Sequence, residues 1–170
     1  MSNPLHYFLC QFATLGPIGK SLPAPGTAGS LVAVILGYYL LPIGWLPFLV
    51  LITLVTVIGV FAADIYSKET NTHDSGKIII DEVSGQWITL LFIPHDNLYF
   101  IAAFLLFRLF DIIKYWPVSW AERLPGGIGV MADDLVAGLM AGIILFGFNS
   151  ISNYYRCICI RYLLKRDKYS

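Results

Sequence analysis

Long apolar stretches alternate along the chain with short polar or glycine- and proline-rich segments. The apolar stretches cover residues 31–41, 46–63, 87–93, 98–107 and 135–148. With their flanking residues they predict helical crossings over about 28–41, 47–66, 81–93, 97–114 and 131–148. A short helix is also expected over 3–14, because Asn3 is a good N-cap and Pro4 suits the first helical position. The pattern predicts an all-α, polytopic membrane helical bundle with about five crossings.

The segments between the apolar stretches contain residues that break helices. Residues 16–30 include seven glycines and prolines among fifteen residues, and they predict a loop. A second loop is expected over 115–130, and Asn97 is the expected N-cap of the fourth crossing. The third crossing has only about 13 residues where a full crossing needs about 20, so we expect it to be less tilted or to end in a protein-lined region.

Composition supports the membrane class. The chain of 170 residues is 57% hydrophobic, only 13% charged, and has a mean hydropathy of +0.71. Soluble domains carry about 25% charged residues. The formal net charge is zero, so no basic field indicates a nucleic-acid partner. We find no signal peptide, and the three cysteines form no disulfide or zinc pattern.

Basic residues gather on one side of the predicted bundle. With five crossings, every Lys and Arg before residue 150 lies on the same side, which the positive-inside rule makes cytoplasmic: Lys20, Lys68, Lys77, Arg108, Lys114 and Arg123. The tail opposes this pattern, since it is basic and falls on the other side. We therefore divide the chain into one membrane domain, 1–150, and a basic tail, 151–170, expected as an amphipathic helix on the membrane surface.

Acidic residues gather at helix ends on the same side as the basic residues. Asp81 and Glu82 open the third crossing, and Asp111 lies near the end of the fourth. Adjacent carboxylates are costly near a bilayer unless a cation binds them. Oxygen ligands favour Mg²⁺ or Mn²⁺ over zinc. The sequence thus predicts a Mg²⁺ site among six acids: Asp74, Asp81, Glu82, Asp111, Asp133 and Asp134.

Other residues near these acids suit a phosphorylated substrate. Arg108 and Lys114 share a helical face with Asp111 at a spacing of three residues. Residues 25–30 lead into the first crossing, so their backbone N–H groups, Thr27 and Ser30 could bind phosphate at a helix N-terminus. There are simpler interpretations of both features. Residues 25–30 could form only a turn and a helix N-cap, and Arg108, Asp111 and Lys114 could form only ion pairs at the membrane interface. His73 is either a proton donor to the leaving group or an ordinary loop residue.

Two functions outside phosphate chemistry stay open at this point. Clustered membrane carboxylates also occur in small cation transporters and channels, although those place charges near mid-membrane and on alternating sides. A structural subunit is the weaker alternative, because it does not require six clustered acids. The other common phosphatase signatures, Cys-x5-Arg, Asp-x-Asp-x-[Thr/Val] and Ser-Gly-His, are absent from the chain.

Four segments of the chain together resemble the phosphatidylglycerophosphatase A family, in the order and spacing of that family. They are Ala24–Leu31, His73–Gly85, Phe107–Lys114 and Gly126–Gly138. The resemblance implies Mg²⁺-dependent hydrolysis of phosphatidylglycerophosphate to phosphatidylglycerol at a bacterial inner membrane, with the site facing the cytoplasm. One departure is Tyr115, where the family usually continues with proline after the lysine.

The resemblance also implies roles for individual residues. The metal ligands would come from Asp74, Asp81, Glu82, Asp111, Asp133 and Asp134. The catalytic set would be Asp81, Glu82, Asp111, Lys114, Asp133 and Asp134, and the phosphate would be bound by Thr27, Ser30, Arg108 and Lys114. We expect one or two Mg²⁺ and an in-line attack by water, with Asp81 or Asp74 as a possible covalent nucleophile. The sequence leaves the oligomeric state open.

Overall fold

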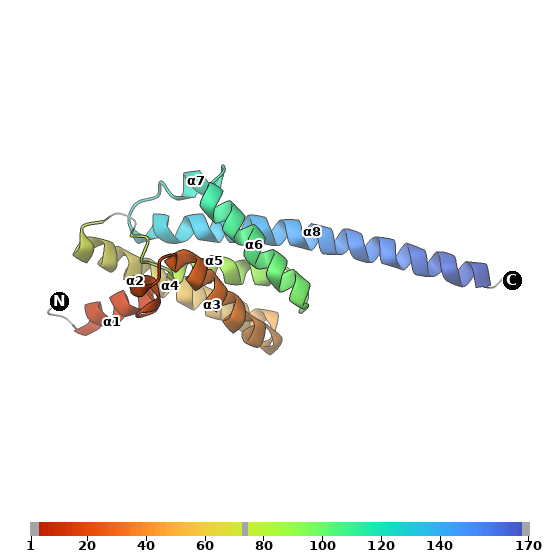
Figure 1. Cartoon of the computed structure of the whole chain (residues 1–170), viewed down its shortest axis with the longest axis horizontal. Helices are drawn as coiled ribbons and strands as arrows, with labels where there is room; N and C mark the ends of the chain where they lie inside the picture. The colour runs from red at the N-terminus through yellow and green to blue at the C-terminus, as the bar shows by residue number, and fades with distance from the viewer. Residues whose placement is uncertain (1–3, 73–74, 168–170) are drawn as a thin grey trace.

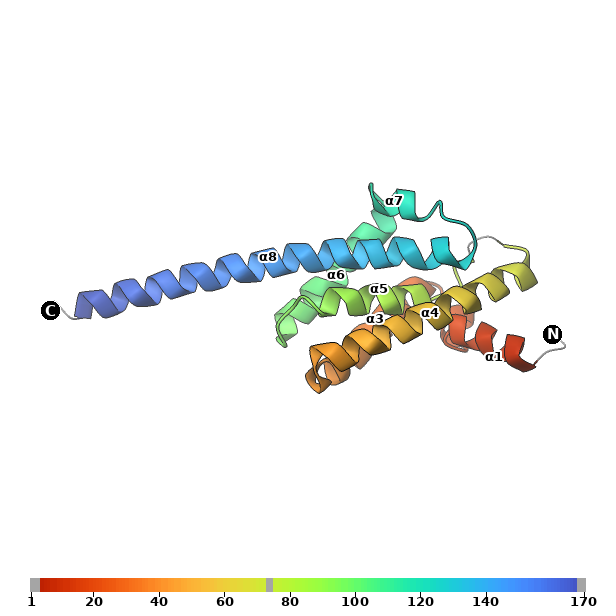
Figure 2. The ribbon, with the colours of Figure 1, turned by 180° about the vertical axis from the view of Figure 1, so that it is seen from behind.

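One short helix, α5 (Ile80–Leu90), lies at the centre of a helical bundle and contacts α3, α4, α6 and α8 (Figures 1 and 2). The computed structural model describes residues 4–72 and 75–167, with side chains up to residue 158. No strand occurs in this described part. The other elements are α1 (Pro4–Ala13), α2 (Ile18–Ser21), α3 (Pro25–Leu40), the 3-10 turn η1 (Leu41–Ile43), α4 (Trp45–Thr70), α6 (Asn97–Ile113), α7 (Val118–Ala121) and α8 (Gly127–Asp167).

Three stretches are long and apolar enough to cross a membrane, namely Pro25–Ile43, Trp45–Thr70 and Gly127–Ile158. Large apolar side chains such as Ile35 and Leu54 are exposed on the outer surface of the bundle, as expected for contact with lipid. At 11 residues, α5 rises only about 16 Å, half of the hydrocarbon thickness. The predicted class, an all-α membrane bundle, is confirmed for the described residues, whereas the predicted count of about five crossings is not.

Several predicted boundaries differ from the structure near the polar segments. Residues 16–30 are not a continuous loop, because α2 forms at Ile18–Ser21 and α3 already begins at Pro25. Proline favours the first turn of a helix, where its missing N–H is not needed. The N-cap of α6 is Asp96 rather than Asn97, and the Asp96 Oδ1 accepts a hydrogen bond of 2.9 Å from the Leu98 N–H.

The last helix is much longer than the sequence predicts. A helix end was expected at Phe148, but α8 continues to Asp167 and has 41 residues. Residues 149–167 contain no glycine or proline, so nothing in this stretch ends the helix. The extension protrudes beyond the rest of the bundle (Figure 1). Its placement on a membrane surface, and the division into 1–150 and 151–170, stay predictions.

Close contact between α5 and α8 determines where the acidic side chains lie. A Cβ on Gly85 would lie 2.4 Å from the Asp134 carbonyl oxygen, so the two backbones approach as closely as glycine permits. The Thr89 hydroxyl reinforces the contact by donating to the Gly138 carbonyl oxygen at 3.0 Å. On the opposite side of α5, the Trp87 indole Nε1–H donates to the Ala33 carbonyl oxygen at 2.9 Å and connects α5 to α3.

Candidate metal and phosphate site

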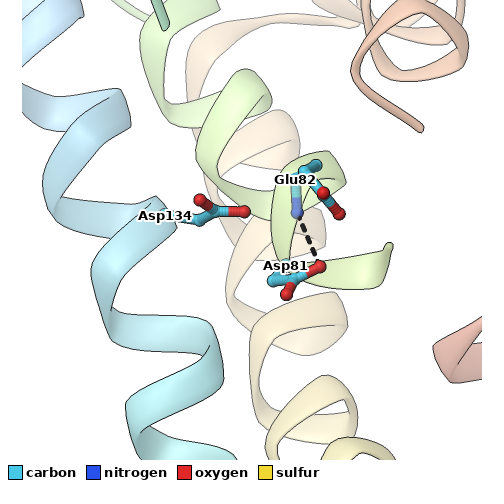
Figure 3. Close-up of side chains that lie close together, drawn as sticks. All are labelled: Asp81, Glu82 and Asp134. Atoms are coloured by element: carbon cyan, nitrogen blue, oxygen red, sulfur yellow. Dashed lines mark hydrogen bonds between the residues drawn. The ribbon is translucent and has the colours of Figure 1, made fainter. Parts of the chain in front are cut away.

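Three carboxylates from two helices converge inside the bundle. Asp81 and Glu82 lie in the first turn of α5, and Asp134 of α8 points toward them (Figure 3). One oxygen from each carboxylate lies within 4.8 Å of the other two. Asp81 is 8% exposed and Asp134 is 3% exposed, while the Glu82 side chain is 13% exposed. We call this group the acidic triad.

The donor set of the acidic triad fits a hard divalent cation. Carboxylates this close repel one another unless they share a proton or a cation. The Asp81 Oδ1 accepts a hydrogen bond of 3.0 Å from the Glu82 N–H, which orients that carboxylate at the start of α5. The Glu82 Oε2 is buried and has no hydrogen-bond partner among the described residues. Oxygen donors of this kind are the ligands that Mg²⁺ and Mn²⁺ prefer.

An arginine connects the acidic triad to two further elements. The Arg108 guanidinium pairs with Asp111 one turn along α6 and lies 3.8 Å from the Glu82 Oε1. Its Nη1 also donates to the Ser30 Oγ at 3.4 Å. A Cβ on Gly26 would clash with the Glu82 Oε1 and lie 3.2 Å from both terminal nitrogens of Arg108, so the first turn of α3 abuts both the Glu82 carboxylate and the guanidinium. A helix N-terminus beside a guanidinium forms an environment that favours an anion.

A lysine forms a second charged cluster just past the end of α6, where Lys114 is the C-cap in a left-handed conformation and so does not share a helical face with Arg108 and Asp111 as predicted. The Lys114 Nζ donates to the Asp133 Oδ2 at 2.9 Å and to the Glu122 Oε1 at 2.6 Å. Burial by itself lowers the pKa of Lys114, but the hydrogen bonds to Glu122 and Asp133 outweigh burial and raise this pKa above its ordinary value. The ammonium group therefore stays protonated at neutral pH, and it holds Asp133 beside the acidic triad.

The structure brings most of the predicted site residues together. Thr27 is the exception among the described ones, since it is exposed on the first turn of α3. His73 and Asp74 lie outside the described residues. The residues placed in or beside the acidic triad are Ser30, Asp81, Glu82, Arg108, Asp111, Lys114, Asp133 and Asp134.

Sequence reasoning missed Glu122. This residue follows α7 and shares Lys114 with Asp133. A usable signal was present, since Glu122 is the single acid between residues 115 and 130 and this loop returns to the start of α8. The glycines that allow α5 and α8 to touch were likewise not predicted as part of the site.

The fold and the site define a helical membrane protein with a buried acidic centre flanked by an arginine and a lysine. The family model of phosphatidylglycerophosphatase A matches residues 11–149, and the chain belongs to this family. It is therefore a phosphatase, an enzyme that hydrolyses a phosphomonoester. These findings do not favour the alternative of a cation transporter or channel.

Three curated relatives cover most of the chain. Phosphatidylglycerophosphatase A of Escherichia coli strain K12 is 39% identical over 149 residues, which is 86% of this chain and 84% of the relative. The Haemophilus influenzae protein of the same name is 39% identical over 147 residues, 85% of this chain and 88% of the relative. A Bacteroides thetaiotaomicron protein, described as a proposed phosphatidylinositol-3-phosphatase, is 41% identical over 135 residues, 75% of this chain and 84% of the relative. No solved structure matches the chain significantly.

Proposed function

We propose that the protein hydrolyses the terminal phosphomonoester of phosphatidylglycerophosphate, releasing phosphate and phosphatidylglycerol for phospholipid synthesis. The family and two relatives carry this activity in their names. The observation that carries the chemistry is the acidic triad, with three carboxylate oxygens within 4.8 Å of one another next to Arg108.

The proposed cofactor is Mg²⁺, held by Asp81, Glu82 and Asp134. These three carboxylates would hold the ion, and a bound divalent ion would supply positive charge that offsets the negative charge of the reacting phosphate. Asp111 pairs with Arg108, which lies next to the triad, and so Asp111 orients the guanidinium. The proposed ligand set leaves out Asp133, because Asp133 pairs with Lys114.

The protein's own cations have a direct task in the proposed reaction. Phosphoryl transfer places negative charge on the three equatorial oxygens of the phosphorus. The Arg108 guanidinium and the first turn of α3 lie next to each other, and both would stabilise this charge. A water oxygen forms the new bond to phosphorus, the bond to the glycerol oxygen breaks, and that oxygen takes up a proton.

The proposed location is a bacterial inner membrane with the acidic triad toward the cytoplasm. The triad lies toward the end of the bundle where Lys68 lies in the last turn of α4 and where Lys20 precedes α3. Basic residues favour the cytoplasmic side of an inner membrane.

A phosphate-release assay tests the proposal. Purified protein is given phosphatidylglycerophosphate with Mg²⁺, and then with EDTA, and the assay is repeated with Asp81→Asn and Asp134→Asn. We expect each variant and EDTA to lower the rate by about 100-fold or more. The matched control is Asp96→Asn, because Asp96 caps α6 away from the site and asparagine caps equally well. Full activity in EDTA, or in both site variants, contradicts the proposed metal site.

A second lipid substrate has one observation in its favour. The Bacteroides relative is described as acting on a phosphoinositide, and it is as similar to this chain as the two phosphatidylglycerophosphatases. The same assay with phosphatidylinositol 3-phosphate separates the two candidates. We expect phosphatidylglycerophosphate to give the higher kcat/KM, and the reverse order would assign the phosphoinositide as substrate.

A further inference from the structure

An apolar groove runs between α3 and α6 on the outer surface of the bundle. It has a volume of about 200 Å³ and is lined by Val34, Ile35, Tyr38, Tyr39 and Phe100. Tyr38 closes one end, since its ring packs against Phe100 at 5.1 Å between centroids. We call this feature the α3–α6 groove.

The α3–α6 groove lies on the same two helices as the contact between Ser30 and Arg108. Ser30 of α3 and Arg108 of α6 meet at 3.4 Å and join the helices at the site. Val34 follows Ser30 by one helical turn, so it lies about 6 Å deeper at a rise of 1.5 Å per residue. Phe100 precedes Arg108 by eight residues, or about 12 Å on the same basis. The lining residues of α3 and of α6 therefore lie at comparable distances along the helices from the Arg108 guanidinium.

This depth matches the dimensions of a phospholipid. Half of the hydrocarbon core of a bilayer is about 15 Å thick. The groove begins about 6–12 Å along the helices from Arg108, which is within the hydrocarbon depth of one leaflet, where the acyl chains of a lipid held at Arg108 lie. The groove offers apolar and aromatic walls over that interval.

We propose that the α3–α6 groove binds an acyl chain of the lipid substrate while its phosphate lies beside Arg108. The inference rests on the proposed function and adds the part of the substrate that the acids and cations do not touch. A lipid bound through its phosphate is tethered on the same two helices as the groove, so its own chain is present there at a high effective concentration. Other bilayer lipids have no such tether.

The expected energetic effect is moderate for a physical reason. An acyl chain in the bilayer is already surrounded by hydrocarbon. Its binding in the groove is therefore stabilised by packing contacts and not by the hydrophobic effect. Each close atom pair contributes only about 0.1–0.2 kcal/mol. We therefore expect blocking the groove to change kcat/KM by about 3- to 10-fold, mainly through KM.

The test compares two identical substitutions. Val34→Trp fills the groove, whereas Val57→Trp places the same side chain on the lipid-facing surface of α4, where Val57 is 50% exposed. Each variant is assayed in mixed micelles with a long-chain and a short-chain phosphatidylglycerophosphate. We expect the preference for long chains to fall about 5-fold in Val34→Trp and to stay unchanged in Val57→Trp. An unchanged preference in Val34→Trp, or an equal fall in both variants, overturns the inference.

A second measurement does not depend on activity or on one variant. A phosphatidylglycerophosphate with a photoreactive acyl chain is irradiated with the wild-type protein in vesicles, and the labelled peptide is identified. We expect labelling of residues 34–39, and a loss of this labelling in Arg108→Ala, where the phosphate tether is missing. Labelling that persists in Arg108→Ala shows ordinary bilayer contact and overturns the inference. Wild-type activity toward the short-chain substrate tests the proposed function separately, so the two failures are distinguishable.

Discussion

Gly138 on α8 lies so close to Gly85 on α5 that a Cβ added to Gly138 would be 2.1 Å from the Gly85 carbonyl oxygen. Asp134 precedes Gly138 by four residues, and Asp81 precedes Gly85 by four residues. Each carboxylate therefore lies one helical turn from the point of closest approach. The separation of the two backbones at the glycines thus determines the distances within the acidic triad.

Adding one methyl group at this contact should impair both stability and activity. Gly138→Ala forces α5 and α8 apart, and we expect a loss of about 1–3 kcal/mol in stability together with a rate at least 10-fold lower. The matched control is Gly147→Ala on the same helix, where a Cβ would meet nothing within 4 Å. Thermal unfolding in detergent and phosphate release measure the two effects. Equal behaviour of the two variants would contradict the dependence of the triad on this contact.

Mg²⁺ should stabilise the folded protein. A cation that binds only the folded state raises its stability by about 2.7 kcal/mol at a concentration 100 times its dissociation constant. We expect the thermal unfolding temperature to rise with Mg²⁺ until the site saturates, and EDTA to reverse the rise. In Asp134→Asn the rise should shrink or vanish, whereas Asp96→Asn should keep it. A rise of the same size in Asp134→Asn would place the cation elsewhere.

Removing the Lys114 ammonium should destabilise the fold. Lys114→Met leaves the Asp133 carboxylate, whose side chain is 8% exposed, without its cation, and we expect a loss of about 1–3 kcal/mol. Because the pKa of Lys114 is raised above its ordinary value, this contribution is complete below that ordinary value and is lost only at more alkaline pH. The difference in unfolding temperature between wild type and Lys114→Met should therefore stay constant from about pH 7 to 9.

A surface lysine provides the control for this prediction. Lys68 pairs with Asp64 on α4, and its side chain is 75% exposed. Exposed ion pairs contribute about 0–1 kcal/mol, so Lys68→Met should change the unfolding temperature little. Glu122→Gln should fall between the two, because it removes one of the two partners of Lys114. An effect of Lys68→Met as large as that of Lys114→Met would contradict a special role for the buried cluster.

Gln86 leads to a prediction about stability alone. It is fully buried in α5, and neither atom of its amide has a hydrogen-bond partner among the described residues. A buried amide without partners costs about 1–3 kcal/mol. We expect Gln86→Leu, which has a similar volume, to unfold at the same temperature as wild type or a higher one. A clear drop in the unfolding temperature would show that the amide is hydrogen-bonded in the folded protein.

Much of the candidate site could be predicted from the sequence, because the acids and bases occur at helix ends that apolar periodicity reveals. Asp81, Glu82 and Asp134 were expected to meet, and they do. The pairing of Lys114 with Glu122 and Asp133 could not be predicted, since it depends on the path of the loop around α7. Hydrophobic pattern does not specify such a path.

The fold was predicted in class but not in helix length. Apolar length shows that a segment can cross a membrane, yet it does not show where the helix that contains it ends. The continuation of α8 past Phe148 depends on the absence of helix-breaking residues over 149–167. The short helix α5 is central because its glycine and small polar residues allow other helices to pack closely against it. The position of apolar stretches along the chain does not predict such close packing.

The uninterrupted length of α8 provides a built-in marker of membrane orientation. The helix rises about 35 Å between Asp134 and Cys157, and the hydrocarbon core is about 30 Å thick. Cys157 is exposed, so we expect its thiol near the face of the bilayer opposite to the acids. In a Cys159→Ser background, a membrane-impermeant maleimide added to intact cells would label Cys157 only if the phosphatase chemistry takes place inside. A single native sulfur atom thus reports which compartment receives the released phosphate.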